Sequence, residues 1–153
     1  MKWHNHMLMA GSCATLLGMH PAEIIYCTAA AALPDRLEAP GGVRLVAHRT
    51  VTHDLLLWGA PLLFLMFFSD YVPRSSLSML LDRMLLPLHF RTWVFFMPGV
   101  LHLAGDFLTP GGIRIAGGKI GLGLFRTGDP AEYMVTALFV MLAFLHLFPG
   151  FRI

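Results

Sequence analysis

Residues 133–148 read YMVTALFVMLAFLHLF, a run without a formal charge. A second run, residues 55–68, reads LLLWGAPLLFLMFF and is equally free of charge. Uncharged apolar helices of this kind are typical of proteins embedded in a bilayer, whose hydrocarbon core is about 30 Å thick. The two runs therefore predict a membrane protein, and the rest of the chain agrees with them.

The composition is that of a chain with too little charge for a water-facing surface. Its 153 residues are 56% hydrophobic and 13% charged, and the mean hydropathy is +0.66. A soluble domain carries about 25% charged residues. The net charge of +2 comes from scattered basic residues, so we expect no nucleic-acid partner. Cys13 and Cys27 lie in apolar stretches, and we expect them to be small core residues rather than a disulfide framework.

The remaining helices are predicted from stretches without charged residues and from the residues that interrupt helices. A Gly-Met-His-Pro break at 18–21 divides the N-terminal stretch into two short helices, for which an uncleaved signal peptide is the alternative. Pro61 and Pro98 are tolerated inside spans because neighbouring helices satisfy the freed carbonyls. Residues 109–128 are glycine-rich and predict a small hairpin that turns at Gly117–Gly118. The predicted segments are helices at 7–17 and 22–32, a span at 55–72, a short amphipathic helix at 77–86, a span at 92–108, strands at 113–115 and 120–125, and the last span at 133–148.

Histidines are unusually frequent for so apolar a chain, and ionisable groups near spans are functional candidates by default. His102 and Asp106 are four residues apart, which places them one turn apart on one helical face. That spacing suits two metal ligands, a ligand with its orienting partner, or a purely structural pair. His48 and His53 do not share a helical face, and by themselves they are better explained as surface polar residues than as ligands.

Helix direction brings these groups together. In an up-and-down bundle, the starts of odd helices and the ends of even helices lie at the same end. Nitrogen and oxygen groups without thiolate suit one metal, or two metals that share a bridging water, with zinc expected first and manganese or iron as alternatives. The predicted ligands at this end are His6, Asp35, His48, His53, His102 and Asp106.

Four local motifs resemble the YdjM-type family of bacterial inner-membrane proteins, which are described as metal-dependent hydrolases. They are HMLMAGSCA at 6–14, LPD at 33–35, HRTVTH at 48–53 and HLAGDFLTPGG at 102–112. The family usually has Gly in place of Thr50, and Asp and His in place of Leu37 and Glu38. Glu38 is therefore either a substitute ligand or the mark of a missing metal position.

The resemblance implies hydrolysis of a phosphoester, or of a lipid near the membrane. It implies that the six predicted ligands hold the metal and that Arg49 contacts a phosphate oxygen. A salt bridge of Arg49 with Asp35 or Glu38 is an equal alternative. Arg49 and Glu38 are thus the catalytic candidates. Thr52 and Thr109 are expected to be helix caps or turn residues.

The expected fold is one domain over residues 1–153, an all-α integral membrane protein of about five helices with a small β-hairpin near the site. Seven basic residues lie on the site face and four on the opposite face, which favours a cytoplasmic site on a multi-pass protein of the bacterial inner membrane. The leading function is a membrane-bound metal-dependent hydrolase. The alternatives are a non-catalytic protein whose structural metal site supports a regulatory protein partner, and a transporter or haem carrier with mid-span histidines, for which only His146 is suitably placed.

Overall fold

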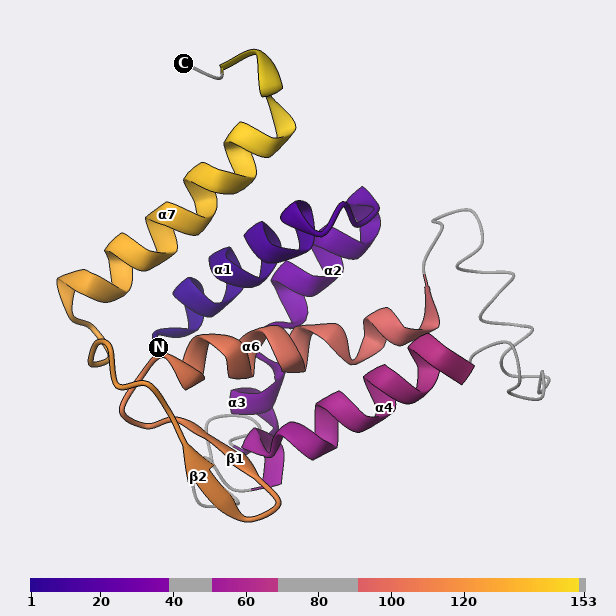
Figure 1. The fold of residues 1–153 in the computed structure, drawn as a ribbon, viewed down its shortest axis with the longest axis vertical. Coiled ribbons are helices and arrows are strands. Elements are labelled where there is room, and N and C mark those ends of the chain that lie inside the picture. The colour runs from indigo at the N-terminus through magenta and orange to yellow at the C-terminus, as the bar shows by residue number, and fades with distance from the viewer. Residues whose placement is uncertain (39–50, 69–90, 152–153) are drawn as a thin grey trace.

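The computed structural model describes residues 1–38, 51–68 and 91–151 of the chain. These residues form mostly helices and one two-stranded antiparallel sheet, which confirms the predicted helical fold with a small hairpin. Figure 1 shows that the starts of α1, α4 and α7 and the end of α6 lie toward the same side as the hairpin. The bundle therefore has one end that gathers the polar groups.

The N-terminal helices are α1 (Trp3–Leu16), α2 (Pro21–Ala30) and the short α3 (Leu33–Glu38). Gly18 separates the first two helices with a φ of 65°, in the left-handed region that glycine adopts without strain. His20 then caps α2: its Nδ1 accepts from the Ala22 backbone N–H at 3.4 Å, and Glu23 accepts from the His20 backbone N–H at 3.1 Å. The predicted break at 18–21 is thus confirmed.

The middle of the chain contains two 3₁₀ turns that each precede a helix. The turn η2 (Val51–His53) precedes α4 (Leu55–Phe68), which contains Pro61 as predicted, and η5 (Thr92–Phe95) precedes α6 (Met97–Phe107). The hairpin and the last helices follow as β1 (Ile113–Ile115), β2 (Gly118–Ile120), α7 (Pro130–Leu147) and η6 (Pro149–Phe151).

Several element boundaries differ from the predictions. The prediction of a membrane span over 92–108 is wrong, because α6 has 11 residues and is about 16 Å long, and most of its side chains are buried between other helices. Asp35 lies just past the second helix, as predicted, but within a short third helix that was not predicted. The hairpin turns at Ala116–Gly117, and residues 121–125 continue without strand pairing. The helix predicted at 77–86 lies outside the described residues.

Small residues let the central helices approach closely. A Cβ on Gly99 of α6 would lie 2.0 Å from the Trp58 ring of α4, and one on Gly11 of α1 would lie 2.3 Å from Thr28 Oγ1 of α2. Cys27 is fully buried in this core, as predicted, whereas Cys13 is partly buried at its edge. The close packing fixes α6 against α1, α2 and α4, the elements around the site.

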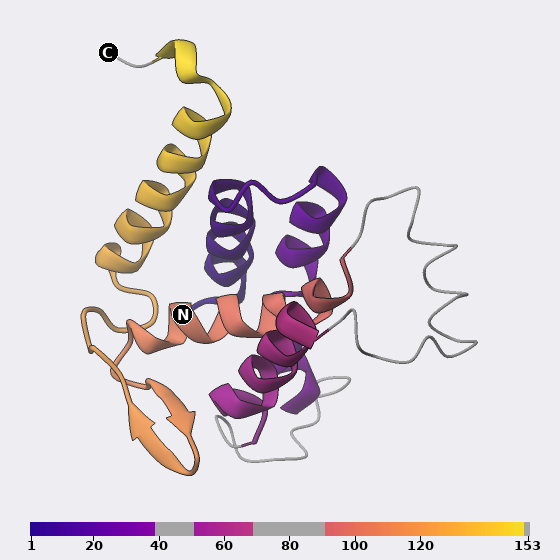
Figure 2. The same cartoon turned by 45° about the vertical axis from the view of Figure 1, so that its right-hand side comes forward.

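One helix in the described part of the chain, α7, is long and apolar enough to cross a membrane. Its 18 residues have a mean hydropathy of 1.6, and 17% of them are buried. Figure 2 shows its C-terminal half extending beyond the other helices. Most of this helix is therefore not covered by the rest of the described chain.

Candidate metal centre

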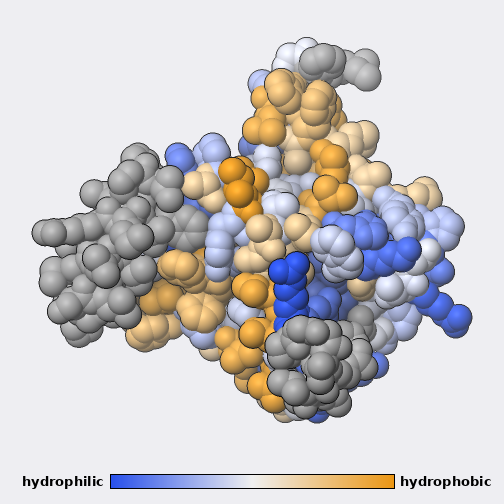
Figure 3. Space-filling model, turned by 180° about the vertical axis from the view of Figure 1, so that it is seen from behind, coloured by the Kyte–Doolittle hydropathy of each residue, from blue (hydrophilic) through white to orange (hydrophobic). Residues whose placement is uncertain are grey.

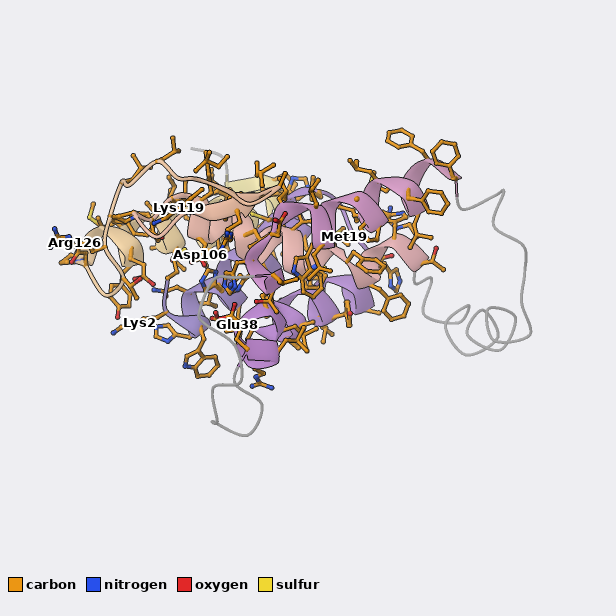
Figure 4. All side chains as sticks on the ribbon, turned by 90° about the horizontal axis from the view of Figure 1, so that it is seen from below. Lys2, Met19, Glu38, Asp106, Lys119 and Arg126 are labelled. Atoms are coloured by element: carbon orange, nitrogen blue, oxygen red, sulfur yellow. The ribbon has the colours of Figure 1, made fainter. Side chains whose placement is uncertain are left out.

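The described residues among the predicted ligands come together at the polar end of the bundle. His6 lies in the first turn of α1, Asp35 in α3, His53 at the end of η2, and His102 and Asp106 one turn apart on α6. Figure 4 shows a cluster of side-chain nitrogen and oxygen atoms between the labelled Asp106 and Glu38. The predicted convergence of these groups is confirmed.

The centre of the cluster is a triangle of possible ligand atoms. His53 Nε2 lies 3.2 Å from His102 Nε2 and 3.4 Å from Asp106 Oδ2, and His102 Nε2 lies 3.7 Å from Asp106 Oδ2. Ligands that bind zinc tetrahedrally at about 2.0–2.1 Å are separated from one another by about 3.3–3.4 Å. The triangle therefore has nearly the size of one face of a tetrahedral zinc site.

Asp35 adds a second carboxylate against the same pair of nitrogens. Its Oδ1 lies 3.3 Å from His53 Nε2 and 3.8 Å from His102 Nε2. Asp35 is also more accessible, because 31% of its side chain is exposed, whereas those of His53 and His102 are fully buried. It is therefore the ligand candidate at the solvent side of the cluster.

Both central histidines are oriented by a partner on their other nitrogen. His102 Nδ1 donates to the carbonyl oxygen of Ala31 at 2.8 Å, since a carbonyl can only accept. His53 Nδ1 lies 2.8 Å from Glu38 Oε1, which also accepts from the Thr52 hydroxyl. A protonated Nδ1 leaves the Nε2 lone pair directed at the centre, as metal-binding histidines require.

His6 completes the cluster from α1. Its ring stacks on that of His102 with the centroids 3.9 Å apart, and its Nε2 lies 3.3 Å from Asp106 Oδ1. His6 Nδ1 is buried and has no hydrogen-bond partner among the described residues. This nitrogen faces Gly105 of α6, where a Cβ would lie 2.9 Å from it, so Nε2 is the atom of His6 that adjoins the cluster.

The polar groups carry the protonation states that metal ligands need. Burial lowers the pKa of His102 to about 3, reinforced by the charge of His6. Burial raises the pKa of Asp106, but the His6 hydrogen bond and the charges of His6 and His102 outweigh it, so the pKa lies far below its usual range. The pKa of Asp35 is lowered in the same way, mainly by His53 and His102. A neutral imidazole and two ionised carboxylates are ready to bind a cation.

His53 is the exception. Burial lowers the pKa of His53, but the hydrogen bond to Asp35 and the charges of Asp106 and Glu38 outweigh this effect. The pKa of His53 therefore lies above its usual value. In the absence of a cation, a proton on His53 thus balances the surrounding carboxylates. A divalent cation would replace that proton.

A cavity of ≈ 300 Å³ leads to the exposed side of Asp35. It is lined by Trp3, Ala32, Asp35 and Arg36. The Arg36 side chain is exposed and makes no ion pair with the residues that the structure describes. Asp35 is therefore the one residue of the cluster that lines this cavity, beside the exposed cation of Arg36.

The structure does not support every predicted role. Glu38, predicted as a catalytic residue or substitute ligand, contacts His53 Nδ1 and also forms a possible ligand group with Asp35 and His53, so both the orienting and the ligand role stay open to test. Thr109 caps the end of α6 through the Asp106 carbonyl, whereas Thr52 binds Glu38 and not a helix end. His48 and Arg49 lie outside the described residues.

Sequence reasoning missed three contributors. Arg36 directly follows the LPD motif, but no sequence pattern assigned it a role at the site. Gly105 lies within the predicted HLAGD motif, and a Cβ there would lie 2.9 Å from His6 Nδ1. The Met1 amino group donates to Asp106 Oδ1 at 3.0 Å, and no sequence pattern indicates this contact.

No family model, curated protein or solved structure matches the chain. The resemblance to the YdjM-type family therefore stays a prediction that depends on the four motifs.

Proposed function

We propose that this chain is a membrane-attached, metal-dependent hydrolase that acts on phosphoesters. The observation that carries the proposal is the buried triangle of His53, His102 and Asp106, with Asp35 exposed at one side. Nitrogen and oxygen ligands without thiolate, with one side open, are typical of catalytic rather than structural zinc sites.

The cation would be held by His53, His102 and Asp106, with Asp35 and His6 as the adjoining ligand candidates. A divalent metal, zinc first and manganese or iron as alternatives, supplies Lewis acidity and lowers the pKa of a coordinated water. The His102 and His53 imidazoles stay oriented through Ala31 and Glu38.

The residues that line the cavity beside Asp35 would bind the substrate and accept a proton. Asp35 stands between the cluster and the cavity, where a half-exposed carboxylate can accept a proton from an attacking water. Arg36 can bind a phosphate oxygen of the substrate through charge-assisted hydrogen bonds. Trp3, which is 58% exposed, offers an apolar wall for the substituent. A phosphoester with an apolar group is therefore the expected substrate class.

Membrane attachment is supported by α7 and by the exposed apolar residues of α4. Figure 3 shows hydrophobic side chains over α7, where this helix extends from the molecule. Phe64, Phe67 and Phe68 of α4 are also largely exposed. We propose the bacterial inner membrane as the location, with the site on its cytoplasmic side as the seven basic residues of that face suggest. The metal site then lies near the bilayer surface, because α7 begins at the polar end of the bundle.

The test is hydrolysis of bis(p-nitrophenyl) phosphate by the detergent-purified chain. We expect activity that chelation abolishes and zinc or manganese restores. Arg36→Ala should raise KM about tenfold or more, because it removes a charged hydrogen bond to the substrate. Asp35→Asn should lower kcat, with Asp129→Asn as the control for loss of a carboxylate elsewhere. Metal-independent activity, or an unchanged KM in Arg36→Ala, would contradict the proposed roles.

The deep burial of His53 and His102 favours one second candidate. Side chains with no exposure are typical of closed structural metal sites. In that case the metal stabilises the fold and the protein acts by binding a regulatory partner. Stoichiometric metal without hydrolysis of any phosphoester, together with unfolding on chelation, would favour this candidate over the hydrolase.

A further inference from the structure

An apolar groove of ≈ 440 Å³ runs between α1 and α7, away from the metal cluster. On α7 its lining residues recur with the period of one helical face, and Leu8 of α1 forms part of the opposite wall. The residues that form the α7 wall are Tyr133, Thr136, Ala137, Val140, Met141 and Phe144. This face of α7 is only partly covered by α1, since Val140, Met141 and Phe144 are each 40% exposed or more.

The length of the groove matches one leaflet of a bilayer. Tyr133 and Phe144 are eleven positions apart, which is about 16 Å along a helix. The hydrocarbon core is about 30 Å thick, so a leaflet is about 15 Å deep. An acyl chain parallel to α7 would therefore fill the groove from the bilayer surface to its middle.

The end of the groove near the start of α7 carries a positive charge. The Lys2 ammonium donates to the Tyr133 hydroxyl at 2.7 Å and lies 5.4 Å from the centre of its ring. Lys2 is exposed, so the ammonium keeps further donors for a ligand. The nearest carboxylate, Glu132, is fully buried and is occupied by Asn5 Nδ2 and the backbone N–H groups of Lys2 and Gly128. A cation beside an aromatic ring at the mouth of an apolar groove complements an anionic phospholipid.

We propose that the α1–α7 groove binds one anionic phospholipid, with the phosphate at Lys2 and Tyr133 and one acyl chain along Ala137, Val140 and Phe144. This inference depends on the proposed membrane attachment through α7 but not on the metal chemistry. The lipid would complete the surface of α7 and hold its start against α1, close to the metal cluster.

Native mass spectrometry of the full chain, released from detergent micelles, tests the proposal. The probes are dioleoyl phosphatidylglycerol and dioleoyl phosphatidylcholine at equal concentrations. We expect a one-to-one adduct with phosphatidylglycerol and a weaker one with phosphatidylcholine. Lys2→Gln should reduce phosphatidylglycerol binding about fivefold, as expected for one lysine near an anionic lipid surface. Lys119→Gln, which removes an exposed lysine of β2, should not.

A second pair of variants tests the groove itself. Ala137→Trp fills the groove and should reduce the adduct tenfold or more, whereas Leu142→Trp places the same side chain on the opposite face of α7 and should leave the adduct unchanged. Equal binding of both lipids with no effect of Lys2→Gln would overturn the headgroup assignment. An adduct that survives Ala137→Trp, or a dimer of the chain that Ala137→Trp abolishes, would overturn the groove assignment. If the chain remains in solution without detergent or vesicles, the membrane attachment itself is wrong. A membrane-bound chain without an adduct contradicts the lipid site alone.

Discussion

Two buried acceptors, the Ala31 carbonyl and the Glu38 carboxylate, decide which histidine nitrogens face the centre of the cluster. Each lies 2.8 Å from an Nδ1 atom, of His102 and His53 respectively. The Nε2 atoms are then 3.2 Å apart with Asp106 beside them. Without these acceptors either imidazole could rotate or bind through its other nitrogen. The account therefore depends on residues that are not themselves ligands.

Glu38→Gln tests this dependence. The amide keeps an acceptor for His53 Nδ1 but loses the negative charge, so we expect the affinity for zinc to fall about tenfold while one equivalent still binds. Competition with a chromogenic chelator measures the affinity, with Asp129→Asn as the control carboxylate. Complete loss of the bound equivalent would instead make Glu38 a direct ligand.

The residues of the cluster were largely predictable, and their orientation was not. His102 and Asp106 follow from helical spacing, and His6, Asp35 and His53 follow from the direction of successive helices. The contact of Glu38 with His53 joins residues of two short elements, α3 and η2, whose approach no local pattern specifies. The unpaired His6 Nδ1 results from the close passage of Gly105, which is visible only once α1 and α6 are packed.

At the scale of elements, α6 holds the centre together because it contacts α1, α2 and α4 along its whole length. Its sequence predicted a membrane span, since apolar residues dominate 92–108. The structure buries those side chains among protein helices instead. Composition alone cannot separate burial in protein from burial in lipid, because both environments favour the same residues. By contrast, the glycine break at 18–21 and the hairpin near Gly117 carry local signals and were predicted.

Gly99→Ala tests the packing of α6 on α4. The added methyl group would meet the Trp58 ring at 2.0 Å, and the Trp58 indole donates to the carbonyl of Thr52 beside His53. We expect the free energy of unfolding to fall by about 1–3 kcal/mol. Gly59→Ala is the matched control, because its Cβ would meet only Leu55 at 3.6 Å and should be neutral or stabilising. Equal effects of the two variants in denaturant unfolding would refute the close approach of α6 and α4.

The ion pair of Glu23 with Arg91 joins α2 to the chain before η5. Glu23 is fully buried and accepts from the Arg91 guanidinium at 2.6 and 2.9 Å. Burial raises the pKa of Glu23, but the hydrogen bonds and charge of Arg91 outweigh it, so the pKa falls below 4.5. Because Arg91 is half exposed, we expect Glu23→Gln to cost about 2 kcal/mol at pH 7, less than for a fully buried pair.

This difference in stability should depend on pH. A lowered pKa in the folded state stabilises the protein above the unfolded value of 4.5, and the benefit is lost as the pH falls through the folded pKa. The gap between the native chain and Glu23→Gln in urea unfolding should therefore shrink below pH 4.5. A gap that stays constant down to pH 2.5 would show that the charge of Glu23 contributes nothing.

At the scale of the whole molecule, a polar end with the metal cluster joins a long apolar helix that the other helices barely cover. The large exposed apolar surface of α7 agrees with the low charge content of the chain. Among the described helices, α7 alone is long and apolar enough to cross a membrane. The span predicted over 92–108 is absent because α6 has 11 residues and packs among other helices, and the end of the span predicted over 55–72 lies outside the described residues.

Leu138→Arg tests the membrane attachment. Leu138 lies near the middle of α7 and is 47% exposed. A charge at the centre of a spanning helix costs about 3 kcal/mol of insertion free energy, so we expect a larger share of the protein in the alkaline-carbonate supernatant. Leu122→Arg, which changes a 56% exposed leucine beyond the hairpin, should remain in the membrane pellet. Equal extraction of both variants would exclude α7 as the anchor.

The most direct test of the central claim is the metal content of the detergent-purified chain, measured by elemental mass spectrometry beside the His53→Ala/His102→Ala double variant. The account predicts about one or two equivalents of a divalent metal, zinc first, in the native chain. It predicts loss of that metal in the double variant while the helical content is retained. Native protein without metal, or a variant that keeps its full metal content, would contradict the assignment of this cluster as a metal centre.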